Sequence, residues 1–86
     1  MGDVRYIIYG ARYCPYCNEA ENLFESHKLP CVFLDMSEDP EGIQEVKDYY
    51  SWETIPVILE NNTLTGKTRL VGGFSDAQDE LGTPDA

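Results

Sequence analysis

The hydrophobic positions of the chain alternate between short continuous runs and stretches with a helical period. Four runs rich in β-branched and aromatic residues are typical of buried strands; they cover 4–9, 31–35, 57–59 and 69–71. Three other segments space their apolar residues three or four positions apart, as amphipathic helices do; they begin near Pro15, Pro40 and Ser75. The polar stretch 60–67 predicts a loop. The predicted order is β-α-β-α-β-β-α.

The helix boundaries and the order of the elements together predict a fold class. Pro15 and Pro40 suit the first helical position, and Asp39 is a favourable N-cap. Ser75 opens a capping-box pattern for the last helix, which we expect to end at Gly82. The first strand–helix–strand unit predicts parallel pairing, and the loop before the last strand predicts antiparallel pairing. We therefore expect an α/β fold with a mixed four-stranded sheet and helices on both faces.

Length and charge narrow the class of protein further. With 86 residues, the chain predicts a single domain spanning 1–86. Six Lys and Arg stand against sixteen Asp and Glu, giving a net charge of −10. This charge argues against nucleic acid and anionic membranes as partners, because both require cations. The N-terminus has no signal-peptide layout, and no segment reaches transmembrane length. We expect a cytoplasmic monomer.

The candidate chemistry lies in the sequence Cys14-Pro15-Tyr16-Cys17, between a predicted strand and a predicted helix. The odd number of cysteines argues against a disulfide framework. Cys31 and His27 are the remaining candidate zinc ligands, and neither has the usual ligand spacing, so we expect no metal. Cys14 falls at the helix N-cap, where the N–H groups and the helix dipole favour a thiolate. Cys17 lies one turn further, on the inward face. Cys14 is therefore the expected nucleophile and Cys17 the resolving thiol.

Three motifs resemble those of one family. Cys14-Pro15-Tyr16-Cys17 resembles the active-site motif of dithiol glutaredoxins, which have the thioredoxin-like fold. Thr54-Ile55-Pro56 resembles that family's Thr-Val-Pro, and Gly72-Gly73-Phe74-Ser75-Asp76 resembles its Gly-Gly-x-x-Asp. The three motifs occur in the family's order and extend over nearly the whole chain. The resemblance implies a glutathione-dependent disulfide oxidoreductase with glutathione as co-substrate and no tightly bound cofactor.

The resemblance also implies a glutathione site. It places Pro56 as a cis proline, the backbone of Ile55 against the cysteinyl part of glutathione, and Ser75 and Asp76 at its γ-glutamyl end. Tyr16 and Thr54 complete the site by the same analogy. The family usually has Lys or Arg three residues before the first active-site cysteine; here that position is Ala11, and Arg12 is the expected substitute. An exposed arginine without a ligand is the competing interpretation of Arg12.

The resemblance leaves several functions open. Expected partners are glutathione and disulfide-containing or glutathionylated proteins, with ribonucleotide reductase as one substrate known in the family. Such a protein serves electron transport and redox homeostasis. One alternative is a redoxin reduced by thioredoxin reductase. Another, of a different class, is a carrier of an iron–sulfur cluster bound by Cys14 and glutathione.

Overall fold

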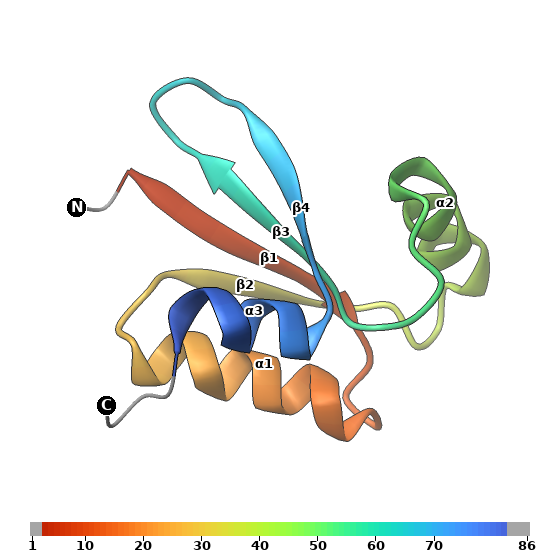
Figure 1. Ribbon diagram of the computed structural model, residues 1–86. Helices are drawn as coiled ribbons and strands as arrows, with labels where there is room; N and C mark the ends of the chain where they lie inside the picture. Colours follow the sequence, from red (N-terminus) through yellow and green to blue (C-terminus); the bar gives the residue numbers. More distant parts are fainter. Residues whose placement is uncertain (1–2, 83–86) are drawn as a thin grey trace.

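A computed structural model describes residues 3–82 and contains the seven elements in the predicted order. They are β1 (Val4–Gly10), α1 (Pro15–Ser26), β2 (Cys31–Asp35), α2 (Pro40–Tyr50), β3 (Val57–Asn62), β4 (Thr68–Gly72) and α3 (Phe74–Leu81). The strands form one sheet in the order β2-β1-β3-β4 (Figure 1). β1 is parallel to β2 and antiparallel to β3, and β3 is antiparallel to β4. The predicted mixed sheet is confirmed.

The main core lies between the sheet and two helices. α1 and α3 run side by side over one face (Figure 1). Alternate residues of β1 face these helices, and the rings of Tyr6 and Phe24 stack with centroids 4.3 Å apart. Ile8, Phe24 and Ile58 are fully buried there. Burial of such side chains provides about 1.5–3 kcal/mol each, so this layer fixes α1, and with it the cysteine pair, on the sheet.

The second helix is attached more loosely. α2 lies on the other side of the sheet from α1 and α3, near the end of β1 (Figure 1). Asp39 caps its first turn, its Oδ1 accepting a hydrogen bond from the Gly42 N–H at 2.9 Å. The apolar residues Ile43, Val46 and Tyr50 of α2 are half-buried, and no residue of α2 is completely buried. α2 therefore covers only part of that face.

Two predicted boundaries are wrong, and each has a physical reason. Residues 60–62 continue β3 instead of forming a loop, because Asn61 finds partners within the sheet: its Oδ1 accepts from Arg5 and its Nδ2 donates to Thr68 Oγ1. The last helix begins at Phe74 with Gly73 as N-cap, so Ser75 lies inside the first turn. The reciprocal cap comes from Asp76, whose Oδ2 accepts from the Gly73 N–H at 2.9 Å.

Candidate active site

The two cysteines of the motif take up the positions predicted for them. Cys14 is the N-cap residue of α1 and is half-buried, and Pro15 occupies the first helical position. The Cys14 carbonyl accepts the first helical hydrogen bond, from the Asn18 N–H at 3.2 Å. Cys17 lies one turn later and is completely buried. The first thiol is thus accessible beside the unpaired N–H groups of a helix terminus, and the second is held behind it.

Burial and a hydrogen bond keep Cys17 protonated. Removal from water raises the pKa of Cys17 to about 12, and a hydrogen bond between the Cys17 thiol and the Cys14 sulfur acts in the same direction. The Ala11 backbone opposes these effects with a hydrogen bond to the Cys17 sulfur. A thiol that keeps its proton is a poor nucleophile but a good hydrogen-bond donor. Of the two thiols, Cys14 is therefore the better placed for nucleophilic attack.

Gly10 makes room for the buried thiol. A Cβ atom built on Gly10, the last residue of β1, would overlap Cys17 Sγ and lie 3.0 Å from Cys17 Cβ. The absence of a side chain therefore lets α1 approach the end of the strand closely enough to bury Cys17. Gly10 thus allows Cys17 to lie directly behind the end of β1.

An open groove of about 540 Å³ runs from Tyr16 to α3. Six of the predicted glutathione-site residues line it: Tyr16, Thr54, Ile55, Pro56, Ser75 and Asp76. They come from the first turn of α1, the segment before β3 and the first turn of α3, which are far apart in the sequence. The fold brings these residues together beside the turn that carries Cys14.

The segment before β3 presents free backbone groups along this groove. The peptide bond between Ile55 and Pro56 is cis, as the family resemblance predicts. Within residues 3–82, neither the N–H nor the C=O of Ile55 takes part in a backbone hydrogen bond. Unpaired backbone groups beside a groove suit an extended peptide that binds as an added strand.

The first turn of α3 forms the far end of the groove. Asp76 Oδ2 is engaged by the Gly73 N–H, and Oδ1 has no partner within the described part of the chain. Asp76 is half-buried, and the neighbouring Ser75 is exposed. This end therefore combines helix N–H groups, which attract anions, with a carboxylate oxygen that can accept from a cation. A zwitterionic amino-acid group fits both.

Arg12 lies outside the groove. Its guanidinium pairs with Glu21 at 2.7 Å, donates to Asn18 Oδ1 at 3.2 Å and lies 3.7 Å from the centroid of the Phe33 ring. Asn18 in turn donates to the Arg12 carbonyl at 2.8 Å. These contacts tie the loop before Cys14 to the outer side of α1 and to β2. The structure thus does not place Arg12 with the other predicted glutathione-binding residues.

The structure adds Trp52 and Phe74 to the site. Phe74 faces Tyr16, with ring centroids 5.9 Å apart. Trp52 lies between the groove and a second cavity beside α2. Phe74 could have been inferred from its place inside the Gly-Gly-x-x-Asp-like motif, whereas Trp52 has no motif of its own.

Within residues 3–82, no three His, Cys, Asp or Glu residues converge as a metal site. No helix of this region is long and apolar enough to cross a bilayer.

Several solved structures share this fold. A buckwheat glutaredoxin in complex with glutathione superposes with a TM-score of 0.70 at 16% identity, covering 92% of this chain and 69% of that one. The dithiolic glutaredoxin of Trypanosoma brucei brucei gives 0.65 at 29% identity, with 94% and 82% covered. The glutaredoxin of Brucella melitensis gives 0.65 at 25% identity, with 99% and 88% covered. No curated protein sequence matches significantly.

The sequence itself also matches a family model. The glutaredoxin model aligns with residues 6–64, which include both cysteines of the active-site motif and the cis proline. That match extends over more than half of the chain, and the glutaredoxins of Trypanosoma brucei brucei and Brucella melitensis share the overall fold. The chain therefore belongs to the glutaredoxin family and is a thiol–disulfide oxidoreductase.

Proposed function

We propose that this protein uses glutathione to reduce protein disulfides and glutathione mixed disulfides. The observation that carries the proposal is the groove beside Cys14, because it joins unpaired backbone groups at Ile55 to the amino-acid-binding end at Asp76. A γ-glutamyl peptide presents an extended backbone and a zwitterionic end, and so matches both features. The complex of the buckwheat glutaredoxin with glutathione supports the same ligand class.

The first step is attack on a mixed disulfide. The Cys14 thiolate attacks the glutathione sulfur of a protein–S–S–glutathione bond, forming a disulfide between Cys14 and glutathione. The protein thiolate leaves and takes a proton from solvent. We expect the groove beside Cys14 to bind the glutathionyl group, so glutathione is the half of the substrate that is retained.

Two routes then restore Cys14. In the first, a second glutathione thiolate attacks the glutathionyl sulfur, releasing oxidised glutathione and the Cys14 thiolate. In the second, Cys17 loses its proton and attacks Cys14 Sγ, releasing reduced glutathione and leaving a Cys14–Cys17 disulfide, which two glutathione molecules reduce. The high pKa of buried Cys17 slows the second route on mixed disulfides. We therefore expect the route through a second glutathione to predominate on these substrates.

A coupled assay tests this proposal. A glutathionylated peptide is supplied with glutathione, glutathione reductase and NADPH, and NADPH oxidation is followed. We expect turnover that depends on glutathione and is abolished by Cys14→Ser. Absence of turnover from the folded wild-type protein would refute the proposal.

Reduction by thioredoxin reductase is the second candidate. It is favoured by the engagement of Arg12 with Glu21, which leaves the expected cation outside the glutathione groove. Replacing glutathione and glutathione reductase by thioredoxin reductase in the same assay separates the two reductants. Faster turnover with thioredoxin reductase would favour this second function.

A further inference from the structure

A second groove adjoins the active-site groove at the first residue of α3. It has a volume of about 340 Å³ and lies between α1 and α3. Phe74 lines both grooves, and its ring centroid lies 5.9 Å from that of Tyr16 in the first turn of α1. We call the second one the α1/α3 groove; its lining residues are Glu19, Asn22, Leu23, Ser26, Phe74 and Gln78. This groove therefore begins beside the active site.

The lining of the α1/α3 groove combines apolar and polar side chains. Leu23 is buried and Phe74 is half-buried, so both provide apolar contact surface. Asn22 on α1 and Gln78 on α3 are exposed, and neither side-chain amide has a hydrogen-bond partner within residues 3–82. Free amide groups can both donate to and accept from a peptide backbone. The lining therefore suits a segment of polypeptide.

The length of the groove determines how much of a polypeptide it can bind. On α1 the lining extends from Glu19 to Ser26, which is about 10 Å along the helix axis. An extended chain covers this distance in about three residues. Glu19 lies about 8 Å further along α1 than Cys14. A residue two or three positions from a cysteine that reacts at Cys14 can therefore reach Glu19.

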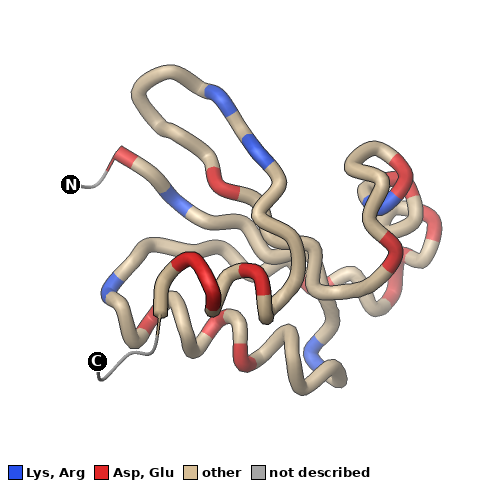
Figure 2. The backbone as a smooth tube through the Cα atoms, in the orientation of Figure 1, with Lys and Arg blue, Asp and Glu red and all other residues tan. Residues whose placement is uncertain are grey.

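The two helices that form the groove carry negative charges and no positive ones. Figure 2 shows Asp and Glu along α1 and α3, and neither helix contains Lys or Arg. Glu21 and Glu80 are paired with arginines that lie outside these helices. Glu19, in contrast, is exposed in the groove and forms no ion pair within the described part of the chain. Its charge is therefore available to a partner.

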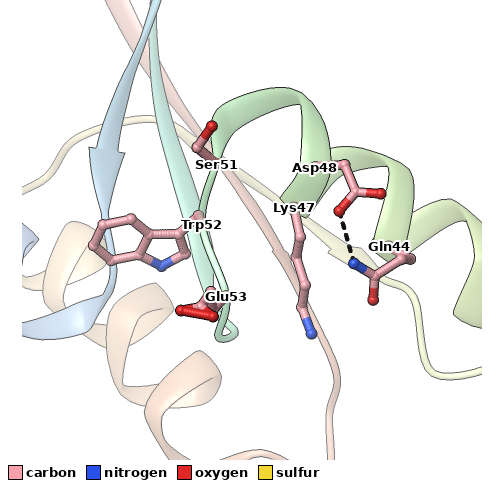
Figure 3. A pocket seen from close by; sticks show the side chains of 6 residues that line it. All are labelled: Gln44, Lys47, Asp48, Ser51, Trp52 and Glu53. Carbon is pink, nitrogen blue, oxygen red and sulfur yellow. Dashed lines mark hydrogen bonds between the residues drawn. The ribbon is translucent and has the colours of Figure 1, made fainter.

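The cations of the described chain do not compete for this carboxylate. No Lys or Arg of residues 3–82 lines the α1/α3 groove. Arg12 is paired with Glu21 on the outer side of α1. Lys47 extends from α2, on the other side of the sheet, beside the cavity that Figure 3 shows. A cation of a bound substrate therefore meets no cation of the protein at Glu19.

We propose that the α1/α3 groove binds the polypeptide segment next to the reacting cysteine of a protein substrate, with a preference for Lys or Arg in this segment. The inference rests on the proposed function, in which the glutathionyl group occupies the groove beside Cys14. The polypeptide half of the mixed disulfide then needs a separate path. The α1/α3 groove provides this path beyond Phe74, and Glu19 selects a basic side chain within it.

Two glutathionylated peptides of equal composition test the assignment. Each has one cysteine and two lysines, placed two positions from the cysteine on either side in the near peptide and seven positions away in the remote peptide. The net charge of the protein attracts both peptides alike, so a difference reports a local contact. In the assay coupled to glutathione reductase, kcat/KM should be about two- to fivefold higher for the near peptide, as for an exposed ion pair. Equal values would overturn the proposal.

Substitutions on two helices separate the groove from the overall charge. Glu19→Gln should bring the ratio of the two kcat/KM values close to one, and Glu19→Lys should bring it below one. Glu45→Gln is the matched control, because it removes the same charge from an exposed position on α2, and it should leave the ratio unchanged. A ratio that persists in Glu19→Gln, or that falls equally in Glu45→Gln, would overturn the assignment.

A binding measurement gives a readout that does not depend on turnover. If the wild-type protein turned over neither peptide, the proposed function would fail, and this measurement would still decide whether the groove binds basic peptides. The near peptide, with Ser in place of its cysteine, is titrated into ¹⁵N-labelled protein. The side-chain NH₂ signals of Asn22 and Gln78 should shift, and Glu19→Gln should raise the Kd about two- to fivefold.

Two outcomes of the titration would contradict the proposal. One is that the Asn22 and Gln78 signals stay in place while signals elsewhere on the protein shift. The other is that both signals shift with protein concentration in the absence of peptide, which would mean that a second copy of the chain occupies the groove.

Discussion

Asp76 combines two roles that a pair of substitutions can separate. Its Oδ2 caps α3 by accepting from the Gly73 N–H, while Asp76 itself lines the groove and its Oδ1 has no partner among residues 3–82. Asp76→Asn keeps an oxygen that can accept the capping hydrogen bond and loses the negative charge. Asp76→Ala loses both. Asp79→Asn is the control for the change in net charge, because Asp79 is exposed and lies about one helical turn further along α3.

The magnitudes follow from the two contacts. Loss of a helix cap costs about 0.5–2 kcal/mol of stability, so Asp76→Ala should lower the free energy of unfolding by this amount and Asp76→Asn by less. Loss of a hydrogen bond between charged groups costs about 1.5–3 kcal/mol of binding. Because 1.4 kcal/mol corresponds to a factor of ten, both variants should raise KM for glutathione about ten- to a hundredfold. Asp79→Asn should change neither quantity.

The assay pairs urea unfolding with glutathione kinetics on the same samples. The expected pattern is a KM that rises similarly in Asp76→Asn and Asp76→Ala, with stability falling mainly in Asp76→Ala. If KM stays at the wild-type value in Asp76→Asn while that variant is folded, the carboxylate is a helix cap and does not contact the ligand. The reasoning about the zwitterionic end of the groove would then be wrong.

Two further predictions concern packing beside Cys17 and the titration of two buried groups. Gly10→Ala should lower the free energy of unfolding by about 1–3 kcal/mol, as overpacking does, because the new methyl group overlaps Cys17 Sγ; a wild-type urea midpoint would contradict the close approach. Burial raises the pKa of Cys17 to about 12 from 9.0 and that of Tyr6 to about 12 from 10.0. Both groups therefore lose protons more easily in the unfolded chain. Their contribution to the free energy of unfolding should be fully present below about pH 9 and should decrease as the pH rises toward 12. Urea midpoints measured across that range check this, and a flat profile would contradict it.

The sequence predicted the architecture well, because its signals are local. Pro15 and Pro40 begin their helices as expected, and Gly82 ends the last one. The polar residues 60–62 misled the prediction, because Asn61 is satisfied by Arg5 and Thr68, on neighbouring strands. Such a partnership depends on the pairing of strands and leaves no trace in local composition.

The candidate site, too, could be predicted from the sequence only in part. Both cysteines and the residues of the three motifs could be placed from the sequence, since each motif carries its own position in the fold. The direction of Arg12 could not, because it depends on Glu21 and Phe33, which become its neighbours only when α1 packs on β2.

The central claim is that Cys14 carries a glutathionyl group during turnover, and trapping this intermediate tests it most directly. In Cys17→Ser the internal route is absent, so the adduct should persist after treatment with a glutathionylated peptide and removal of free thiols. Mass spectrometry of the intact protein and of its peptides should show one added glutathione, located on Cys14. An unmodified protein, or a glutathione found on Cys31, would contradict the account.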